Sequence, residues 1–138
     1  MGTASTDCST RGHGPAMTLS QVGPAVFDSV TFVAMNSALD GLSMRQRVIA
    51  DNIANLQTPG FRAGRVSFEA SLADAVRQGT GAVSAAVSRS DEPARADGNN
   101  VNLDTETLSA IDTNLRYELA TRAVDGTFDK LRTAMRTS

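Results

Sequence analysis

Apolar residues gather in two stretches of this chain, and in both they recur at the spacing of an amphipathic helix. Residues 26–56 and 103–136 hold most of the Leu, Ile, Val, Met and Phe, whereas the segment between them is rich in Gly, Ser, Ala and charged residues. The 138 residues include five Phe, one Tyr and no Trp. Because large side chains are few and unevenly placed, one large self-contained core is not expected.

The first stretch predicts a long helix over residues 26–56. Its apolar positions alternate by three and four residues, which is the spacing of a coiled-coil stripe. The stripe consists of Phe32, Met35, Leu39, Leu42, Ile49, Ile53 and Leu56, with Gln46 filling the gap. Gly41 is a weak point that costs about 1 kcal/mol relative to alanine. At 1.5 Å per residue such a helix is about 45 Å long, so the predicted element is a rod.

The second stretch predicts a helix over residues 104–138. Asp97-Gly98 is a turn signal, and Asn102 or Asp104 can cap the helix by accepting a backbone N–H. Two adjacent apolar stripes follow the cap. One consists of Leu108, Ile111, Leu115 and Leu119, and the other of Tyr117, Ala120, Val124, Phe128, Leu131 and Met135. A stripe that moves sideways along a helix is typical of a helix with more than one packing partner.

Residues 57–103 predict a loop-rich connector with at most a short strand or short helix. A short strand is expected around residues 66–68, followed by a helical turn or two, and residues 77–100 have the composition of a loop. The fold class is therefore mainly α, with two long terminal helices forming an antiparallel coiled-coil-like hairpin. Two helices alone bury one seam and leave apolar surface outside, which indicates self-association or a larger helical assembly.

The charge pattern argues against several partners. The net charge of -2 is spread evenly along the chain, without the basic face that nucleic acid or an anionic membrane attracts. No small-molecule substrate is indicated. Residues 1–25 are expected to be a disordered leader, and residues 1–16 lack the apolar stretch of a cleavable signal peptide. Met17 is an alternative start.

No pattern of catalytic, cofactor-binding or metal-binding residues is found, so the chain is not expected to be an enzyme. Cys8 and His13, the only residues of their kinds, lie in the leader, which cannot hold a fixed geometry. The stretch 97–108 fails as a calcium loop, because Val101 and Leu108 replace oxygen ligands. The lone Gly-x-Gly at 79–81 is weak evidence for a phosphate site.

The sequence "ADNIANLQTPGF", residues 50–61, ends the first predicted helix. Asn52 and Asn55 lie on one helix side, where their amides can bridge to backbone or to a neighbouring helix. Alternatively, Asn55 adopts the left-handed conformation at the helix end. Pro59 blocks the helix, and Pro59-Gly60 suits the centre of a type II turn. Phe61 then emerges as an apolar anchor.

This stretch closely resembles the N-terminal signature of the bacterial flagellar axial proteins, which include the basal-body rod protein family. That signature has Asn-(apolar)-Ala-Asn, two variable residues, then Thr-Pro-Gly-aromatic. Its fixed positions are met by Asn52, Ile53, Ala54, Asn55, Thr58, Pro59, Gly60 and Phe61. The short connector resembles that of the proximal rod members, and residues 97–104, 115–117 and 128–135 carry the same likeness. The resemblance covers roughly residues 26–136.

The resemblance implies a structural subunit of the proximal rod, which polymerises through its terminal helices into the drive shaft that transmits torque for motility. Its implied partners are other copies of itself, other rod proteins, the MS-ring and rod-adaptor proteins at the rod base, and the flagellar export apparatus. It also implies a place in the periplasm-spanning rod of the basal body, reached by type III export. The alternatives are a sister proximal rod protein and a small helical adaptor or chaperone that does not polymerise.

Residues 52–61 are then expected to form an assembly joint, where the chain leaves the tube of helices. The seams are expected to meet within one subunit and between neighbouring subunits. The residues expected to pack are Met35, Leu39, Leu42, Ile49, Ile53, Leu56, Leu108, Ile111, Leu115, Val124, Phe128, Leu131 and Met135.

Overall fold

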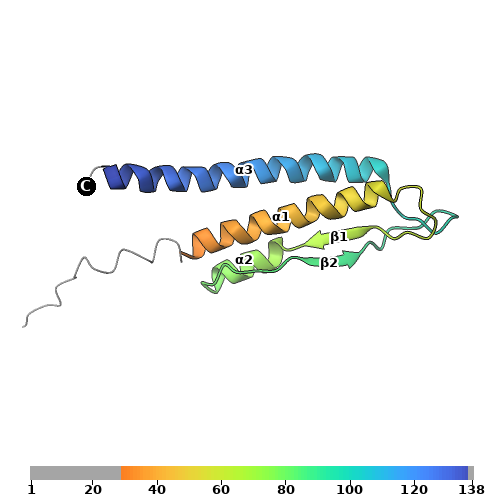
Figure 1. The fold of residues 1–138 in the computed structure, drawn as a ribbon. Coiled ribbons are helices and arrows are strands. Elements are labelled where there is room, and N and C mark those ends of the chain that lie inside the picture. Colours follow the sequence, from red (N-terminus) through yellow and green to blue (C-terminus); the bar gives the residue numbers. More distant parts are fainter. Residues whose placement is uncertain (1–28, 137–138) are drawn as a thin grey trace, which may run out of the picture.

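A computed structural model describes residues 29–136 of the chain. The expected leader, residues 1–25, lies outside this range. In chain order the described elements are α1 (Val30–Ala54), β1 (Gly64–Ser67), α2 (Glu69–Arg77), β2 (Ala86–Arg89) and α3 (Leu103–Arg136). The described part is elongated and mainly helical, with α3 on one side of α1 and the β strands with α2 on another (Figure 1).

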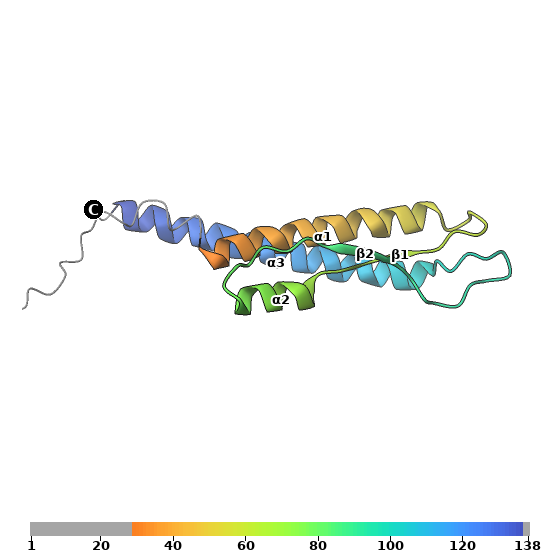
Figure 2. The same cartoon turned by 90° about the horizontal axis from the view of Figure 1, so that it is seen from below.

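Helices α1 and α3 lie side by side and run in opposite directions (Figures 1 and 2). Three contacts along the two helices show this antiparallel arrangement. The Phe32 ring meets the Phe128 ring at 5.9 Å between centroids, edge to face. Further along, Gln46 Nε2 donates to Asn114 Oδ1 at 2.7 Å. Near the end of α1, Asn52 Nδ2 donates to Glu106 Oε2 at 3.1 Å.

The N-terminal ends of both long helices are set by capping side chains. Ser29 Oγ accepts from Phe32 N at 3.4 Å and begins α1. Helix α1 ends at Ala54, two residues before the predicted end. Helix α3 begins at Leu103, and its cap is Asn102 rather than Asp104, because Asn102 Oδ1 accepts from Asp104 N at 3.0 Å. An amide oxygen at this position satisfies a helix N–H that has no partner within the helix.

The connector holds more regular structure than the sequence predicts. The strand expected near residues 66–68 and the helical turns expected after it correspond to β1 and the nine-residue α2, whereas β2 was not predicted. Strands β1 and β2 pair antiparallel, with Gly64 opposite Arg89 and Ser67 opposite Ala86. Strands of four residues are too short to show a clear alternation. In addition, β2 is exposed at every position, so it carries no apolar signal.

The core is small and lies where α1 meets β1 and the start of α2. Leu42, Val66 and Phe68 form its centre. Met44, Val48, Leu72, Ala85 and Ala120 pack around it. The Phe68 ring lies directly over Gly41, where a Cβ atom would be 2.7 Å from the ring. Gly41 is therefore required for packing in α1, and the sequence pattern had indicated only a weak point.

Candidate assembly site

The end of α1 turns sharply through the predicted motif. Asn55 has φ -100° and ψ 15°, so the left-handed alternative for this residue is wrong. Its Nδ2 instead donates to the Asp51 carbonyl at 2.8 Å, and its Oδ1 accepts from Thr58 Oγ1 at 3.2 Å. Phe61 N donates to the Thr58 carbonyl at 3.3 Å. With φ 73° at Gly60, this is the predicted type II turn, in which glycine accepts the positive φ.

Asn99 caps the end of α1 from the far side of the connector. It is fully buried, and its Nδ2 donates to the carbonyls of Asn55, Leu56 and Thr58 at 3.0, 3.3 and 2.9 Å. The last carbonyls of a helix have no partner within the helix. The three carbonyls belong to the C-cap residue Asn55 and to the turn after it, so a side chain 44 residues away from Asn55 fixes the turn that ends α1.

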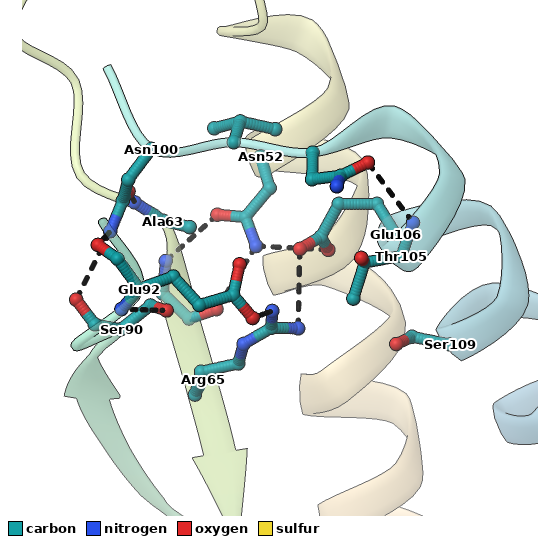
Figure 3. Close-up of polar contacts among 12 residues, drawn as sticks. Asn52, Ala63, Arg65, Ser90, Glu92, Asn100, Thr105, Glu106 and Ser109 are labelled. Atoms are coloured by element: carbon teal, nitrogen blue, oxygen red, sulfur yellow. Dashed lines mark hydrogen bonds and ion pairs between the residues drawn. The ribbon is translucent and has the colours of Figure 1, made fainter. Parts of the chain in front are cut away.

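Asn100 holds the two sides of the connector together. Its Oδ1 accepts from Ala63 N at 2.7 Å. Its Nδ2 donates to the carbonyls of Ser90 and Glu92, both at 3.1 Å (Figure 3). The side chain is buried. Because its hydrogen bonds all go to main-chain groups, it fixes the backbone path between β1 and α3.

Asn52 joins α1 to β1 and α3. Its Oδ1 accepts from Gly64 N at 2.9 Å, and its Nδ2 donates to the Gly64 carbonyl at 3.0 Å and to Glu106 Oε2 (Figure 3). Only 1 % of Asn52 is exposed. The close approach of β1 depends on Gly64, since a Cβ atom there would lie 2.8 Å from Val48 Cγ1. The predicted bridging role of Asn52 is confirmed.

Glu106 is a buried carboxylate at the centre of this network. It is fully buried, and Arg65 Nη1 lies 3.2 Å from its Oε1. This pair is ionic but lacks hydrogen-bond geometry, and Oε1 has no other partner within residues 29–136. Arg65 also pairs with Glu92 Oε1 at 2.8 Å. Burying a carboxylate is costly without an opposite charge, so Arg65 is the compensating group.

Sequence reasoning missed the residues that complete this network, namely Arg65, Asn99, Asn100 and Glu106. Asn99 and Asn100 had been assigned to a turn, and Glu106 lies in the first turn of a helix, where acids are common. The available signal was the run Asn99-Asn100-Val101-Asn102, since three asparagines in four residues exceed what one turn and one cap need.

The motif residues divide between the interior and the surface. Asn52 is buried, while Asn55 and Phe61 are half-buried. Ile53, Ala54, Thr58, Pro59 and Gly60 are exposed. The buried residues hold the joint together within the chain, and the exposed residues leave one side of it accessible.

The predicted packing residues also divide by exposure. Leu42 and Ile49 are buried. Met35, Leu39, Leu56, Val124 and Leu131 are half-buried. Ile53, Leu108, Ile111, Leu115, Phe128 and Met135 are exposed to between 37 % and 79 % in the single chain.

Two faces of α3 explain the two stripes in its sequence. Ala120 packs against the core and Phe128 meets Phe32, so the second stripe faces α1. Leu108, Ile111, Leu115 and Leu119 are 69 %, 60 %, 57 % and 56 % exposed, and we call them the outer ridge. At about 100° per residue these four lie opposite the buried Glu106 and Thr113. The outer ridge therefore faces away from α1.

A shallow groove lies between α1 and α3. It has a volume of about 340 Å³ and is lined by Gln46, Ile49, Ala50, Ile53, Ala110 and Asn114. Small side chains such as Ala50 and Ala110 permit close approach of another helix. The groove is thus a second, partly apolar surface, separate from the outer ridge.

Glu69 shows the clearest electrostatic effect among the described residues. Partial burial raises the pKa of its carboxyl, but hydrogen bonds from the backbone N–H groups of Glu69 and Phe68, together with Arg45, outweigh burial and lower it below its ordinary value of 4.5. Arg45 Nη2 lies 2.6 Å from Glu69 Oε1, and its guanidinium carbon lies 5.0 Å from the centre of the Phe68 ring. This pair ties α1 to the start of α2.

Chemistry beyond packing finds little support in residues 29–136. In this range no group of three or more His, Cys, Asp or Glu residues is placed to hold a metal ion. Nor does any helix of the described chain have the length and apolar character needed to cross a membrane.

The sequence of α1 and of the turn after it matches a known protein family. Residues 34–62, which include most of α1 and the turn after it, match the family model described as flagella basal body rod protein. The class is therefore that of the flagellar rod proteins.

Several proteins that match most of the chain show which kind of rod protein it is. The chain is 35% identical over 106 residues to the flagellar basal body rod protein FlgB of Borrelia hermsii, covering 60% of this chain and 78% of the relative. It is 31% identical over 111 residues to FlgB of Escherichia coli strain K12, covering 64% and 80%. FlgB of Bacillus subtilis strain 168 is 28% identical over 121 residues, covering 78% and 94%. The chain belongs to the FlgB family of flagellar basal body rod proteins.

Family membership decides several predictions from the sequence. The family is structural rather than enzymatic, and its place is the flagellar basal body, where its members assemble with other rod proteins. The sister proximal rod protein FlgC and the helical adaptor, which were the alternatives, are not favoured, because these relatives are FlgB proteins.

Proposed function

We propose that the chain polymerises through its terminal helices into the proximal rod, the part of the drive shaft nearest its base, and there helps to transmit torque. The observation that carries this proposal is the outer ridge. Four large apolar residues in a row on α3 are more than half exposed and point away from α1. Contiguous exposed apolar surface of this kind marks a site of protein association.

The repeating unit in this proposal is an antiparallel coiled-coil-like hairpin of α1 and α3. Its inner seam includes Leu42 and Ala120, which belong to the same core, and also the buried Ile49 and the Phe32–Phe128 contact. Its outer surface is the outer ridge and, separate from it, the groove. Side-by-side packing of such hairpins buries the ridge of each subunit against a neighbour, as the predicted packing residues require.

In the same proposal the joint at residues 52–61 fixes where the chain leaves the tube. Its interior side is held by Asn52 and Asn99, so the turn has one conformation before assembly. Its exterior side presents Ile53, Thr58 and Pro59, which are exposed. A rigid turn with exposed apolar groups is suited to contact an adjacent subunit.

The partners in this proposal are other copies of the chain, other rod proteins, and the MS-ring and rod-adaptor proteins at the rod base. The chain would reach the periplasm-spanning rod through the flagellar export apparatus, without a cleavable signal peptide. Support for these finer partners comes from the resemblance of the motif and the C-terminal helix to proximal rod proteins.

Deleting the gene in its own host and restoring it tests the proposal. We expect the deletion strain to lack rods in purified basal bodies and to be non-motile, and the wild-type gene to restore both. Restoring it with Pro59→Ala and Gly60→Ala together should give stable subunit in the cell but fewer rods, because the exit turn is lost. Normal rods and swimming in the deletion strain would contradict the proposal.

A further inference from the structure

Helix α3 continues past the start of α1, and its last turns have no helix beside them in the described part of the chain (Figures 1 and 2). Phe128 meets Phe32 close to the start of α1, while α3 continues to Arg136. The second apolar stripe of α3 nevertheless extends into these last turns with Leu131 and Met135. Met135 is 79 % exposed, so the stripe ends on an uncovered apolar side chain.

Residues 129–136, which we call the overhang, carry an excess of positive charge. They contain the bases Lys130, Arg132 and Arg136 and the single acid Asp129. Arg132 lies 3.5 Å from Asp129, measured between Nη1 and Oδ1. Neither Lys130 nor Arg136 forms an ion pair within the described part of the chain. The overhang is therefore an apolar helix end surrounded by basic side chains.

A pocket lies at the opposite end of the molecule, where α1 ends and α3 begins, and we call it the joint pocket. Its volume is about 420 Å³. A cavity of about 150 Å³ holds a benzene-sized group, so the joint pocket has room for more than one aliphatic side chain. Val101 is buried and Leu103 is 45 % exposed. The residues that line the pocket are Leu56, Glu92, Pro93, Arg95, Asn100, Val101, Asn102 and Leu103.

Acidic side chains surround the joint pocket. Glu92 is part of the lining, and the exposed Asp91 and Asp104 directly adjoin lining residues in the sequence. Neither Asp91 nor Asp104 is in an ion pair with another described residue. The lining base Arg95 lies 3.7 Å from Asp97, measured between Nε and Oδ1. An acidic edge around an apolar pocket complements the basic, apolar overhang.

We propose that the overhang of one copy of the chain binds in the joint pocket of a second copy. The two surfaces cannot meet within one chain, because they lie at opposite ends of α3, whose 34 residues are about 50 Å long. A contact between two different surfaces of identical chains continues head to tail instead of closing on a dimer. The inference rests on the proposed polymerisation, and it names a contact along the rod axis.

The test locates the overhang in the purified full chain, at a concentration where it associates. A photoreactive amino acid replaces Met135 in unlabelled protein, which is mixed with unmodified chain carrying a heavy isotope. Mass spectrometry after irradiation then identifies linked peptides, and a pair with mixed labels joins two copies. We expect mixed-label links from position 135 to the segment that contains Val101 and Leu103. The same amino acid at Arg116, which is exposed in the middle of α3, should give no such links.

Charge reversal tests the electrostatic part of the proposal. Asp91→Lys and Arg136→Glu should each lower the yield of this cross-link at least about twofold, because an attraction between exposed charges becomes a repulsion. The two changes together should restore the yield, since the charges are exchanged and the attraction returns. Circular dichroism should show the same helix content in all three variants, because both residues are exposed.

Three results would overturn the proposal. The first is the absence of mixed-label links from position 135 to the joint pocket, as when that position links only to residues 1–28 of its own chain. The second is an equal yield of such links from position 116. The third is a double charge variant whose yield stays as low as that of either single variant. Rods that form normally in the restored deletion strain without this contact would leave the proposed function in place.

Discussion

Two glycines in the long helices look equivalent in the sequence but have different surroundings in the structure. A Cβ atom at Gly41 would lie 2.7 Å from the Phe68 ring, whereas one at Gly126 would meet no heavy atom within 4 Å. Both residues lie within helices. The cost of glycine in a helix is therefore offset by packing at Gly41 and by nothing visible within this chain at Gly126.

This difference predicts opposite effects of the same substitution. Gly41→Ala should lower the free energy of unfolding by about 1–3 kcal/mol, because overpacking against Phe68 outweighs the gain in helix propensity. Gly126→Ala should raise it by up to about 1 kcal/mol. Urea unfolding followed by circular dichroism measures both. Effects of equal sign in the two variants would show that Phe68 does not constrain Gly41.

Glu69 predicts a pH dependence of stability. Its carboxyl pKa in the folded chain is lowered from 4.5, through backbone hydrogen bonds and Arg45 acting against partial burial. A lowered folded pKa means that the stabilising effect is complete above 4.5 and disappears as the pH falls through the lowered value. Glu69→Gln should therefore show a smaller loss of thermal stability on acidification than the parent.

Melting temperatures measured between about pH 6 and pH 3 decide this point, because the range brackets the reference pKa of glutamate. Glu118→Gln is a suitable control, because Glu118 is exposed and its Oε2 lies 3.8 Å from Arg122 Nη2, which is a long distance for an ion pair. If acidification lowers the melting temperature of Glu69→Gln as much as that of the parent, the role given to the Arg45–Glu69 pair is contradicted.

At the scale of elements, the two long helices and the strand–helix step at residues 64–77 were predictable, but the rest of the connector was not. The apolar repeats of α1 and α3 extend over many turns, so their period is clear. Strands β1 and β2 have four residues each, and β2 has no buried position. The connector is ordered by buried asparagines whose partners are distant in sequence, such as Asn99 with Asn55, 44 residues apart. No local pattern contains such pairs.

The candidate site was likewise predictable only in part. The stop at Pro59 and the turn at Gly60 follow from local stereochemistry, and the structure contains both. The asparagines of the motif predicted hydrogen bonds but not their partners. Arg65 and Glu106 have ordinary sequence neighbours, and only the fold brings them together beside Asn52.

We therefore expect that replacing Asn99 affects a segment far from it in sequence. Asn99→Ala removes the donor to three carbonyls in the turn that follows α1 and should cost about 1–3 kcal/mol. Backbone hydrogen exchange should accelerate at residues 55–61. Asn114→Ala, which removes one exposed hydrogen bond, should change stability by no more than about 0.5 kcal/mol. Unchanged exchange at residues 55–61 in Asn99→Ala would contradict the capping role.

At the scale of the whole molecule, the described part of the chain is a long rod with a small core. Leu42, Val66 and Phe68 are the buried centre, while the 34 residues of α3 leave the outer ridge exposed. A single chain of this shape buries little of its apolar surface. The exposed large apolar residues are those that the proposed packing of subunits would bury.

The most direct test of this account is cross-linking from the outer ridge inside assembled basal bodies. A photoreactive amino acid replaces Leu115 in the deletion strain restored with this chain, and replaces the exposed Arg89 of β2 in a control strain. Basal bodies are purified, irradiated and compared with the soluble fraction. We expect the Leu115 position to give species heavier than one subunit in basal bodies and none in the soluble fraction. The account would be contradicted if the subunit is present in basal bodies and position 115 forms no cross-link, while position 89 does.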